Sequence, residues 1–455
     1  MFFDKVIKNG KVVTPDGVID TDIGIKDGII SELKSNLTDA EEIVDASGMY
    51  VMPGVVDAHV HLCEPGRTDW EGFLTGTKAL AKGGTTTYVD MPLNNLPATT
   101  NKAAMLLKKQ SAKGKNYVDY ALYGGLIPEN EDDLEGLYEE KAAAYKCFVA
   151  TCGSSEEGDF KNVDDYDLYK GMKKLASLGQ VLSIHCENAA ICDKLAEEYM
   201  KEGKKDMQSY LSSRPIFAEV EAVRRVLYLG KITGCKLHFV HLSCAEAVDE
   251  VVKAKKEGMD VTIETCPHYL VLTDEDCVKI GSCAKCSPPI RNKAEQEKLW
   301  EKIFDGSVDT IASDHSPCPE NMKINKDNDI FKAWGGISAC QNVLDVMFDE
   351  ACKKRNLPVH KLAELLSENP ARRFGLKGKG AIKVGNDADI VILNSEKSYV
   401  LNEGDMYYKN KMSAYTGRNI GCKVEKTFLR GQLVYDSENG IQGEPQGKFI
   451  ARCSD

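Results

Sequence analysis

Apolar runs alternate with helical stretches through the middle of the chain, and this alternation limits the folds open to it. Stretches such as Tyr166–Leu178, Phe217–Leu229 and Cys244–Lys256 have helical character. Between such stretches lie eight short runs that are expected to be strands: Gly54–His59, Thr85–Asp90, Tyr117–Tyr123, Ala143–Val149, Gln180–His185, Lys236–His241, Val261–Thr265 and Thr310–Asp314. Eight strand–helix units over about 320 residues predict a (β/α)8 barrel, in which active sites lie at the carboxyl ends of the strands.

A doubly wound parallel sheet is the structural alternative to the barrel. The glycine-rich phosphate fingerprint that usually accompanies such a sheet is absent from this sequence. We therefore favour the barrel.

Both ends of the chain are rich in short β-branched segments and turn pairs. Asn9-Gly10, Asp16-Gly17 and Asp27-Gly28 are typical hairpin turns within the first fifty residues. Near the other end, strands are expected at 388–393 and on both sides of Arg430-Gly431. Because chain termini often lie close together, the two ends are expected to pair into one small sheet domain.

Composition excludes several classes of partner. The chain has 455 residues, 42% of them hydrophobic and 28% charged, as in ordinary globular proteins. This length corresponds to two or three domains' worth of material. A net charge of −12 disfavours a nucleic-acid partner. No apolar run approaches the roughly 18 residues of a membrane helix, and the first residues lack a basic-then-apolar signal pattern. We expect a cytoplasmic protein that binds neither nucleic acid nor membranes.

Sixteen cysteines are too few for a disulfide scaffold of this length. In a reducing cytosol they are expected to be free thiols. Cys283 and Cys286 form the only Cys-X-X-Cys pair, and without a second pair a structural zinc ribbon is not expected.

His59 and His61 close the first apolar run of the predicted barrel. Side chains two apart on a strand face the same way, so both imidazoles are expected to point to one side. Two neutral imidazoles at a strand end suit a divalent metal. Taken alone, the pair is equally compatible with two polar residues that happen to end a strand.

Further ligand-type residues lie on or at the ends of later predicted strands, and these raise the odds of a metal site. They are Lys146, His185, His241 and Asp314. The chain has only eight histidines, and four of them, His59, His61, His185 and His241, fall at predicted strand ends. Imidazoles and a carboxylate at an open barrel mouth predict a hydrolytic metal centre. Lys146 is the exception, because an unmodified ammonium has no lone pair for a metal. Alone, it would be interpreted as a lysine that points outward or pairs with an acid.

The other four histidines receive lesser roles. His238 is out of register with His241 and is expected to face the surrounding helices. His268 and His315 flank the predicted mouth and are candidates to support the ligands, whereas His360 is expected on a surface helix.

The ligand set resembles the binuclear metal site of the cyclic amidohydrolases, the group of hydantoinases, dihydroorotases and allantoinases. Its members are His59, His61, Lys146, His185, His241 and Asp314. The resemblance covers nearly the whole chain and extends to the flanking residues. The matching segments are Asp57-Ala58-His59, Glu64-Pro65-Gly66-Arg67, the segment 146–153 (Lys-Cys-Phe-Val-Ala-Thr-Cys-Gly), His185-Cys186-Glu187-Asn188, Cys286-Ser287-Pro288-Pro289-Ile290-Arg291 and Ser313-Asp314-His315-Ser316-Pro317.

The resemblance implies a cofactor and a domain plan. Two divalent metals would be held by His59, His61, Lys146, His185, His241 and Asp314, with zinc as the first expectation and cobalt, manganese or iron as others. Lys146 would be carboxylated by carbon dioxide and bridge the metals as N6-carboxylysine. The chain ends would form a β-sandwich, which gives the divisions 1–52, 53–380 and 381–455. Members of the family are commonly homotetramers.

Within this family the sequence is most similar to the allantoinases, which open the ring of allantoin. Dihydroorotases have a carboxylate-binding arginine where this chain has Cys63, and hydantoinases have a tyrosine where it has Thr151. The resemblance assigns proton transfer to Asp314. It assigns the ring's amide edge to the backbone around Ser287, while the candidates for the ureido arm are Asn94, Cys152 and Ser316. A turn asparagine without a ligand is the alternative for Asn94.

Other functions remain as alternatives. A hydantoinase, dihydropyrimidinase or dihydroorotase would act on a related cyclic amide. A deaminase-like or phosphotriesterase-like barrel is a further enzyme class, and a non-enzymatic scaffold with the same fold is a remote one. The polar segment 317–336 is expected either to close over the mouth as a lid, with Trp334 covering the ring, or to be a long solvated loop.

Overall fold

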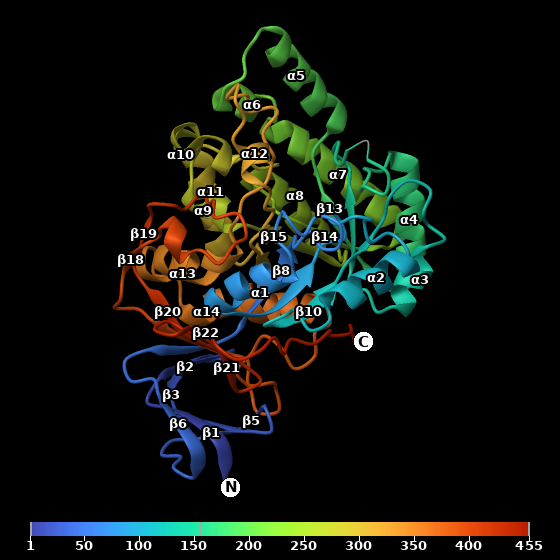
Figure 1. The fold of residues 1–455 in the computed structure, drawn as a ribbon. Coiled ribbons are helices and arrows are strands. Elements are labelled where there is room, and N and C mark those ends of the chain that lie inside the picture. The colour runs from blue at the N-terminus through green and yellow to red at the C-terminus, as the bar shows by residue number, and fades with distance from the viewer. Residues whose placement is uncertain (1, 155, 454–455) are drawn as a thin grey trace.

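A barrel of parallel strands forms the centre of the protein, which we describe from a computed structural model covering residues 2–154 and 156–453 (Figure 1). Its strands are β8 (Val55–Val60), β9 (Thr85–Asp90), β10 (Asp119–Leu122), β11 (Gly124–Gly125), β12 (Tyr145–Phe148), β13 (Val181–His185), β14 (Lys236–Phe239), β15 (Val261–Thr265) and β16 (Thr310–Ile311). β10 and β11 are two parts of one strand, the first paired with β9 and the second with β12. A parallel bridge from Val60 to His315 closes the ring. The predicted eight-stranded barrel is confirmed.

Two predicted barrel strands extend two or three residues too far at their carboxyl ends, and the difference matters for the site. β14 ends at Phe239 and β16 at Ile311, so His241 and Asp314 lie on the turns that follow. Both residues have left-handed backbone, with φ of 39° and 46°. Because this conformation interrupts strand alternation, the direction of these side chains does not follow from counting along the strand.

His238 lies inside the barrel, and the expectation that it faces the helices is wrong. It is paired in register with Ser183, two residues before His185 on β13. Its Nε2 is 3.2 Å from Oε2 of Glu264 on β15. Strand alternation holds as far as Phe239, and the turn after that residue brings His241 to the same side.

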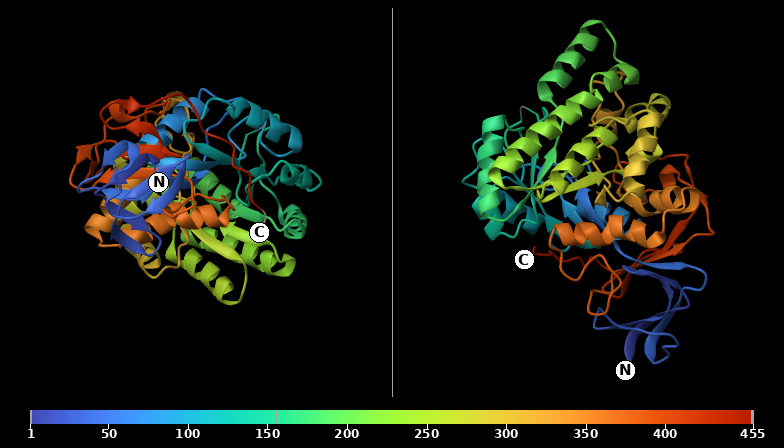
Figure 2. Two further views of the ribbon diagram at one scale, coloured as in Figure 1. Left: turned by 90° about the horizontal axis from the view of Figure 1, so that it is seen from below. Right: turned by 180° about the vertical axis from the view of Figure 1, so that it is seen from behind.

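Helices surround the barrel and cover its ends (Figure 2). They are α1 (Phe73–Lys82), α2 (Lys102–Ala112), α3 (Leu134–Glu139), α4 (Asp165–Ser177), α5 (Ala189–Lys201), α6 (Met207–Ser212), α7 (Ile216–Thr233), α8 (Ala245–Lys256), α9 (Pro267–Val271), α10 (Asp274–Ile280), α11 (Lys293–Phe304), α12 (Glu320–Lys323), α13 (Val343–Met347), α14 (Val359–Ala363) and α15 (Asn369–Arg373). Short 3₁₀ turns are η1 (Gly281–Ala284), η2 (Cys340–Asn342) and η5 (Glu403–Asp405), and π-helical turns are η3 (Phe348–Lys354) and η4 (Glu364–Glu368). The three predicted helices correspond to α4, α7 and α8.

Both chain ends build the sheets below the barrel in Figure 1. A seven-stranded sheet has the order β22-β21-β20-β17-β7-β2-β3, and a four-stranded sheet has the order β5-β4-β1-β6. The N-terminal strands are β1 (Phe3–Lys8), β2 (Lys11–Thr14), β3 (Gly17–Asp20), β4 (Ile23–Lys26), β5 (Ile29–Leu33), β6 (Ala40–Asp45) and β7 (Tyr50–Pro53). The C-terminal strands are β17 (Ile390–Asn394), β18 (Tyr399–Val400), β19 (Asn419–Ile420), β20 (Lys423–Leu429), β21 (Gln432–Asp436) and β22 (Gly440–Ile441). The predicted pairing of the two ends is confirmed.

Local sequence explains the hairpin at the C-terminal end. Arg430 and Gly431 have φ of 47° and 73° and connect β20 to β21, the geometry that two-residue hairpin loops require. Apolar side chains from both chain ends, including Ile7, Ile25 and Ile392, form a common core. Beyond β22, Ile450 donates to the carbonyl of Tyr120, so the last segment lies against the barrel strand β10.

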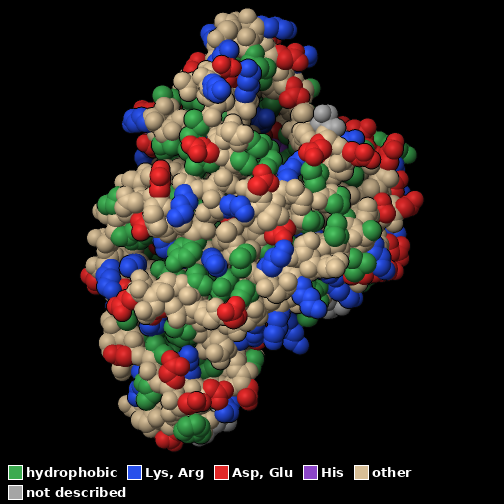
Figure 3. Space-filling model, in the orientation of Figure 1, with side chains coloured by type: hydrophobic (Ala, Val, Ile, Leu, Met, Phe, Trp, Pro, Cys, Tyr) green, Lys and Arg blue, Asp and Glu red, His purple; other side chains and the backbone are tan. Residues whose placement is uncertain are grey.

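Acidic and basic side chains are interspersed over the face drawn in Figure 3. Among the described residues, no helix is both long and apolar enough to span a bilayer. The sixteen cysteines are free thiols.

Candidate metal centre

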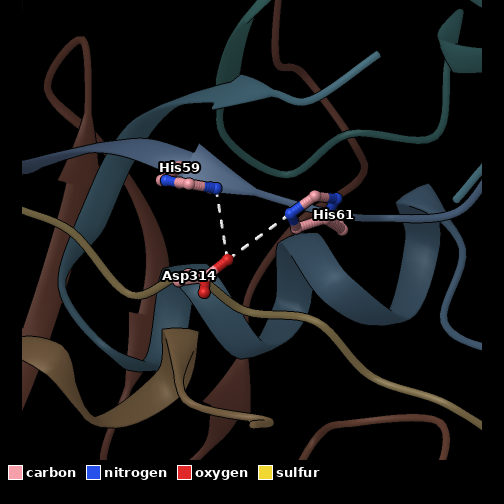
Figure 4. Close-up of side chains that lie close together, drawn as sticks. All are labelled: His59, His61 and Asp314. Atoms are coloured by element: carbon pink, nitrogen blue, oxygen red, sulfur yellow. Dashed lines mark ion pairs between the residues drawn. The ribbon is translucent and has the colours of Figure 1, made fainter. Parts of the chain in front are cut away.

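His59, His61 and Asp314 form a compact group at the carboxyl ends of the first and last barrel strands (Figure 4). The Oδ1 atom of Asp314 is 3.2 Å from Nε2 of His59 and 3.4 Å from Nε2 of His61. Burial alone would raise the pKa of the Asp314 carboxyl, but the neighbouring histidines lower it well below its usual range. Burial lowers the pKa of His61 to about 4, so this imidazole is neutral and has a lone pair for a metal.

His185 and His241 form a second group beside the first. Nδ1 of His185 lies 3.1 Å from Nε2 of His241, and the His241 ring is 5.4 Å from the His59 ring. Burial lowers the pKa of both imidazoles. Two neutral rings with their nitrogens this close share one proton at most, so a cation between them would satisfy both lone pairs.

Lys146 lies on β12 and is completely buried. Within the described part of the chain, its Nζ has no hydrogen-bond partner. Burial lowers its pKa, and its charge would act on His61, His185 and His241 alike. An unpaired buried amine is costly. The position therefore suits a lysine that is modified or that meets a ligand.

These residues fit a pair of divalent cations. Two sets of donor atoms face inward, from His59, His61 and Asp314 on one side and from His185 and His241 on the other. Lys146 is electrostatically coupled to both sets. Imidazole and carboxylate donors in this number suit borderline divalent metals.

Two buried carboxylates orient the histidines. Glu264 accepts from Nδ1 of His59 at 2.7 Å, which leaves Nε2 of that ring for the centre. Glu187 accepts from Nε2 of His185 at 2.8 Å, which leaves Nδ1 of that ring for the centre. Arg214 pairs with Glu187 and, against the effect of burial, helps to lower the pKa of its carboxyl to about 2. Such partners fix the tautomer and the ring orientation of metal-binding histidines.

A pocket of about 210 Å³ opens onto the centre. All six predicted ligands except Lys146 line it, and so do all four predicted substrate-binding residues: Ser287, Asn94, Cys152 and Ser316. Asn94 donates from Nδ2 to Oγ of Ser316 at 3.3 Å, and Oγ of Ser287 bonds the hydroxyl of Tyr210 at 2.7 Å. The pocket wall also includes Thr151, Arg214, Trp334 and Gly335.

Cys63 does not line this pocket. It packs with Trp70 and Cys318 in a small apolar cluster. The residue at position 63 is therefore no guide to the charge of the pocket wall, in which Arg214 is the cationic side chain.

His315 and His268 are both buried near the centre. The His315 carbonyl accepts from the backbone N–H of His61 at 2.8 Å, and its ring stacks on Tyr408. Neither ring nitrogen of His268 has a hydrogen-bond partner among the described residues. His360 is partly exposed on α14, as the sequence indicates.

The sequence interpretation missed Glu264 and Arg214. Glu264 carried a usable signal, because an acid within the apolar strand 261–265 must have a buried partner. Arg214 had none, since it lies between α6 and α7, far along the chain from the residues it meets.

Comparison with known proteins agrees with this geometry. Residues 50–434 match the model of the amidohydrolase family. Two Escherichia coli allantoinases are 50% and 49% identical over 453 residues, 99% of this chain and of each relative. The structure of an L-hydantoinase (dihydropyrimidinase) from Arthrobacter aurescens matches with a TM-score of 0.95 at 33% identity, covering 99% of this chain and 100% of that one. A dihydropyrimidinase from Brevibacillus agri matches with a TM-score of 0.91 at 30% identity over 98% of both chains.

Proposed function

The chain belongs to the amidohydrolase family, and from this we propose that it hydrolyses the ring amide of allantoin to give allantoate. The observation that carries the substrate is 50% identity to an allantoinase over 99% of both chains. The reaction would serve the breakdown of purine-derived ureides for nitrogen assimilation. Hydantoinase activity is the second candidate, supported by the structural match to the L-hydantoinase.

Two divalent cations, zinc first among them, would be held by His59, His61 and Asp314 on one side and His185 and His241 on the other, with Lys146 between. When bound, they would supply an activated water and polarise the ring carbonyl. Both bonded contacts of Asp314 use Oδ1. Its Oδ2 is therefore the atom we assign to carry a proton from the attacking water to the leaving ring nitrogen.

The environment of Lys146 supports its carboxylation. Burial lowers its pKa and so favours the neutral amine. A neutral amine attacks carbon dioxide and releases one proton, which gives an anionic carbamate with two donor oxygens. This N6-carboxylysine would replace an unpaired amine by an anion with an oxygen donor for each cation.

The pocket wall supports a neutral, polar substrate. Arg214 is already paired with Glu187, so it is not free to balance a substrate carboxylate such as that of dihydroorotate. Asn94, Ser316 and Cys152 would meet the ureido arm, and the backbone around Ser287 the amide edge of the ring. Because Nδ2 of Asn94 donates to Ser316, its Oδ1 is left to accept from a ureido N–H.

Turnover of three substrates under one metal loading tests the proposal. We expect kcat/KM to be highest for allantoin, lower for 5-phenylhydantoin and lowest for dihydroorotate. An apolar arm leaves polar groups of the wall unpaired, at about 1–3 kcal/mol each. A higher kcat/KM for 5-phenylhydantoin than for allantoin would favour a hydantoinase. A higher kcat/KM for dihydroorotate would favour a dihydroorotase.

We also propose that each chain is divided at 1–52, 53–380 and 381–455 into the two parts of the sheet domain and the barrel between them. The protein is further proposed to be a homotetramer in the cytoplasm. The helix α7 supports self-association, because it exposes Phe217, Tyr228 and Ile232 by 60%, 68% and 55%. Their spacing places them on one face of the helix. Sedimentation equilibrium of the wild type and of Tyr228→Glu would test the assembly, with a smaller species expected for the variant.

A further inference from the structure

Lys323, the last residue of α12, is buried beside the substrate pocket. In Figure 1, α12 lies between α6 and the barrel strands. Its Nζ donates to three main-chain carbonyl oxygens, those of Lys285, Trp334 and Gly336. Two of these carbonyls belong to one end of the segment 317–336, and the third precedes Ser287 by two residues. One side chain therefore joins both parts of the pocket wall.

Only the ammonium form of Lys323 satisfies this arrangement. It has three N–H donors for three acceptors, whereas a neutral amine has two. Within the described residues, no carboxylate lies at ion-pairing distance from Lys323, so the carbonyl dipoles alone compensate its charge. Burial lowers its pKa only to about 8, so the cation still predominates at neutral pH.

The backbone that Lys323 holds is part of the pocket. Trp334 and Gly335 line it together with Ser287 and Ser316. The indole Nε1 of Trp334 donates to the carbonyl of Ser316 at 3.1 Å. A Cβ on Gly336 would lie 2.4 Å from that same carbonyl oxygen, so the two backbones touch at this point.

A second buried lysine fastens the outer part of the same segment. Lys285 donates from Nζ to the carbonyls of Phe331 and Ala333, and its own carbonyl accepts from the N–H of Gly336. The edge of Trp334 also packs on Trp70, with ring centroids 4.8 Å apart. Residues 331–336 are thus held by several bonds, which argues against a loose solvated loop at this end of the segment.

We propose that Lys323 is a positioning residue that sets the spacing between the Trp334–Gly336 wall and the Ser287 wall, and thereby the size of the substituent that the pocket admits. The inference deepens the proposed function and rests on it for the identity of the substrate. Lys323 does not line the pocket itself and acts through the carbonyls it holds.

The principal test is Lys323→Met, which keeps an unbranched side chain one atom shorter than lysine and removes all three donors. Lys326→Met, an exposed lysine three residues away, is the matched control. We expect KM for allantoin to rise about tenfold with kcat within about twofold, the signature of lost ground-state binding. The preference for allantoin over 5-phenylhydantoin should fall by a similar factor. Unchanged KM and preference in folded Lys323→Met would overturn the proposal.

A second variant addresses the same wall without removing the lysine. Gly336→Ala adds a methyl group that must displace Ser316, so it should raise KM in the same way. If Lys323→Met does not fold, a Gly336→Ala variant with wild-type KM and preference would overturn the proposal by itself.

A fluorescence measurement separates this inference from the proposed function, because it needs no turnover. Acrylamide should quench the fluorescence of Trp334 more strongly in Lys323→Met than in Lys326→Met, and the increase should disappear when Trp334→Phe is added. Greater quenching in an enzyme that does not turn over allantoin would support the positioning role and refute the substrate. Equal quenching with normal allantoin turnover would do the reverse.

Discussion

The Nδ1 atom of His185, at the end of β13, and the Nε2 atom of His241, on the turn after β14, face each other at 3.1 Å. Different nitrogens of the two rings are used because Glu187 occupies the opposite nitrogen of His185. Nδ1 of His185 and Nε2 of His241 are therefore the two nitrogens that would bind a cation.

We predict about two divalent metals per chain in gently purified or reconstituted protein, as two facing donor groups require. His185→Ala should lose one of them and most of the turnover. His360→Ala, which changes a histidine on α14, should keep both. Elemental analysis after removal of free metal gives the count, and a fully active wild type that never exceeds one metal would contradict the binuclear centre.

Lys146→Ala should lose nearly all turnover and much of its metal, because it cannot form the proposed bridging carbamate. Added acetate or propionate should restore part of both, since a small carboxylate fits the space left by the side chain. Lys108 is equally buried but pairs with Asp90, so Lys108→Ala should show no such rescue. Metal content and rate are measured with and without the acid; wild-type behaviour of Lys146→Ala without it would exclude the carbamate.

Asp314→Asn should lower kcat by about 10²–10⁴-fold with a smaller change in KM, because proton transfer acts in the transition state. Asp314 also faces His59 and His61, so metal content must be determined on the same sample. A fully metallated variant with unchanged kcat would assign the proton transfer to another group.

Glu264→Gln should weaken metal binding by about 10–100-fold, the usual effect of removing a carboxylate that orients a ligand. The amide retains the volume of Glu264 and an oxygen that can accept from Nδ1–H of His59, but it lacks the negative charge that strengthens this hydrogen bond. Glu257→Gln, at an exposed ion pair with Lys231, is the control and should bind metal like the wild type. Competition with a chelator of known affinity measures the effect, and equal affinities would show that Glu264 is not needed for orientation.

Local patterns were sufficient for the barrel, for the paired chain ends and for the positions of the candidate ligands. Strand alternation predicted that His59 and His61 share a face, and both imidazoles do contact the carboxylate of Asp314. It failed for His238, because the turn after Phe239 reverses the register on which the reasoning depended. The left-handed φ of His241 and Asp314 has no marker in the sequence, since both are non-glycine residues.

Contacts made by single charged side chains on the loops could not be predicted. Arg214 meets Glu187, and Lys323 meets Lys285, across loops whose relative placement depends on the completed barrel. Single lysines and arginines in polar segments resemble solvated surface residues, and only tertiary packing distinguishes them.

Lys379→Met should destabilise the protein by about 3–5 kcal/mol, the cost of removing one partner from a buried charge network. Its Nζ lies 2.6, 2.7 and 2.8 Å from carboxylates of Asp119, Asp387 and Asp389, which join the barrel strand β10 to the C-terminal part of the chain.

The pKa of Lys379 is raised, so its contribution is fully present at any pH below the normal lysine value. Burial raises the pKa of Asp389 to about 6, so this carboxyl takes up a proton in the folded state before it does so in the unfolded one. Without the cation the pKa of Asp389 rises further, and protonation of its carboxyl then relieves the repulsion. The deficit should therefore be largest above about pH 7 and shrink toward pH 5. Urea unfolding at both pH values, with exposed Lys377→Met as the control, measures it; a deficit that grows as the pH falls would contradict this account.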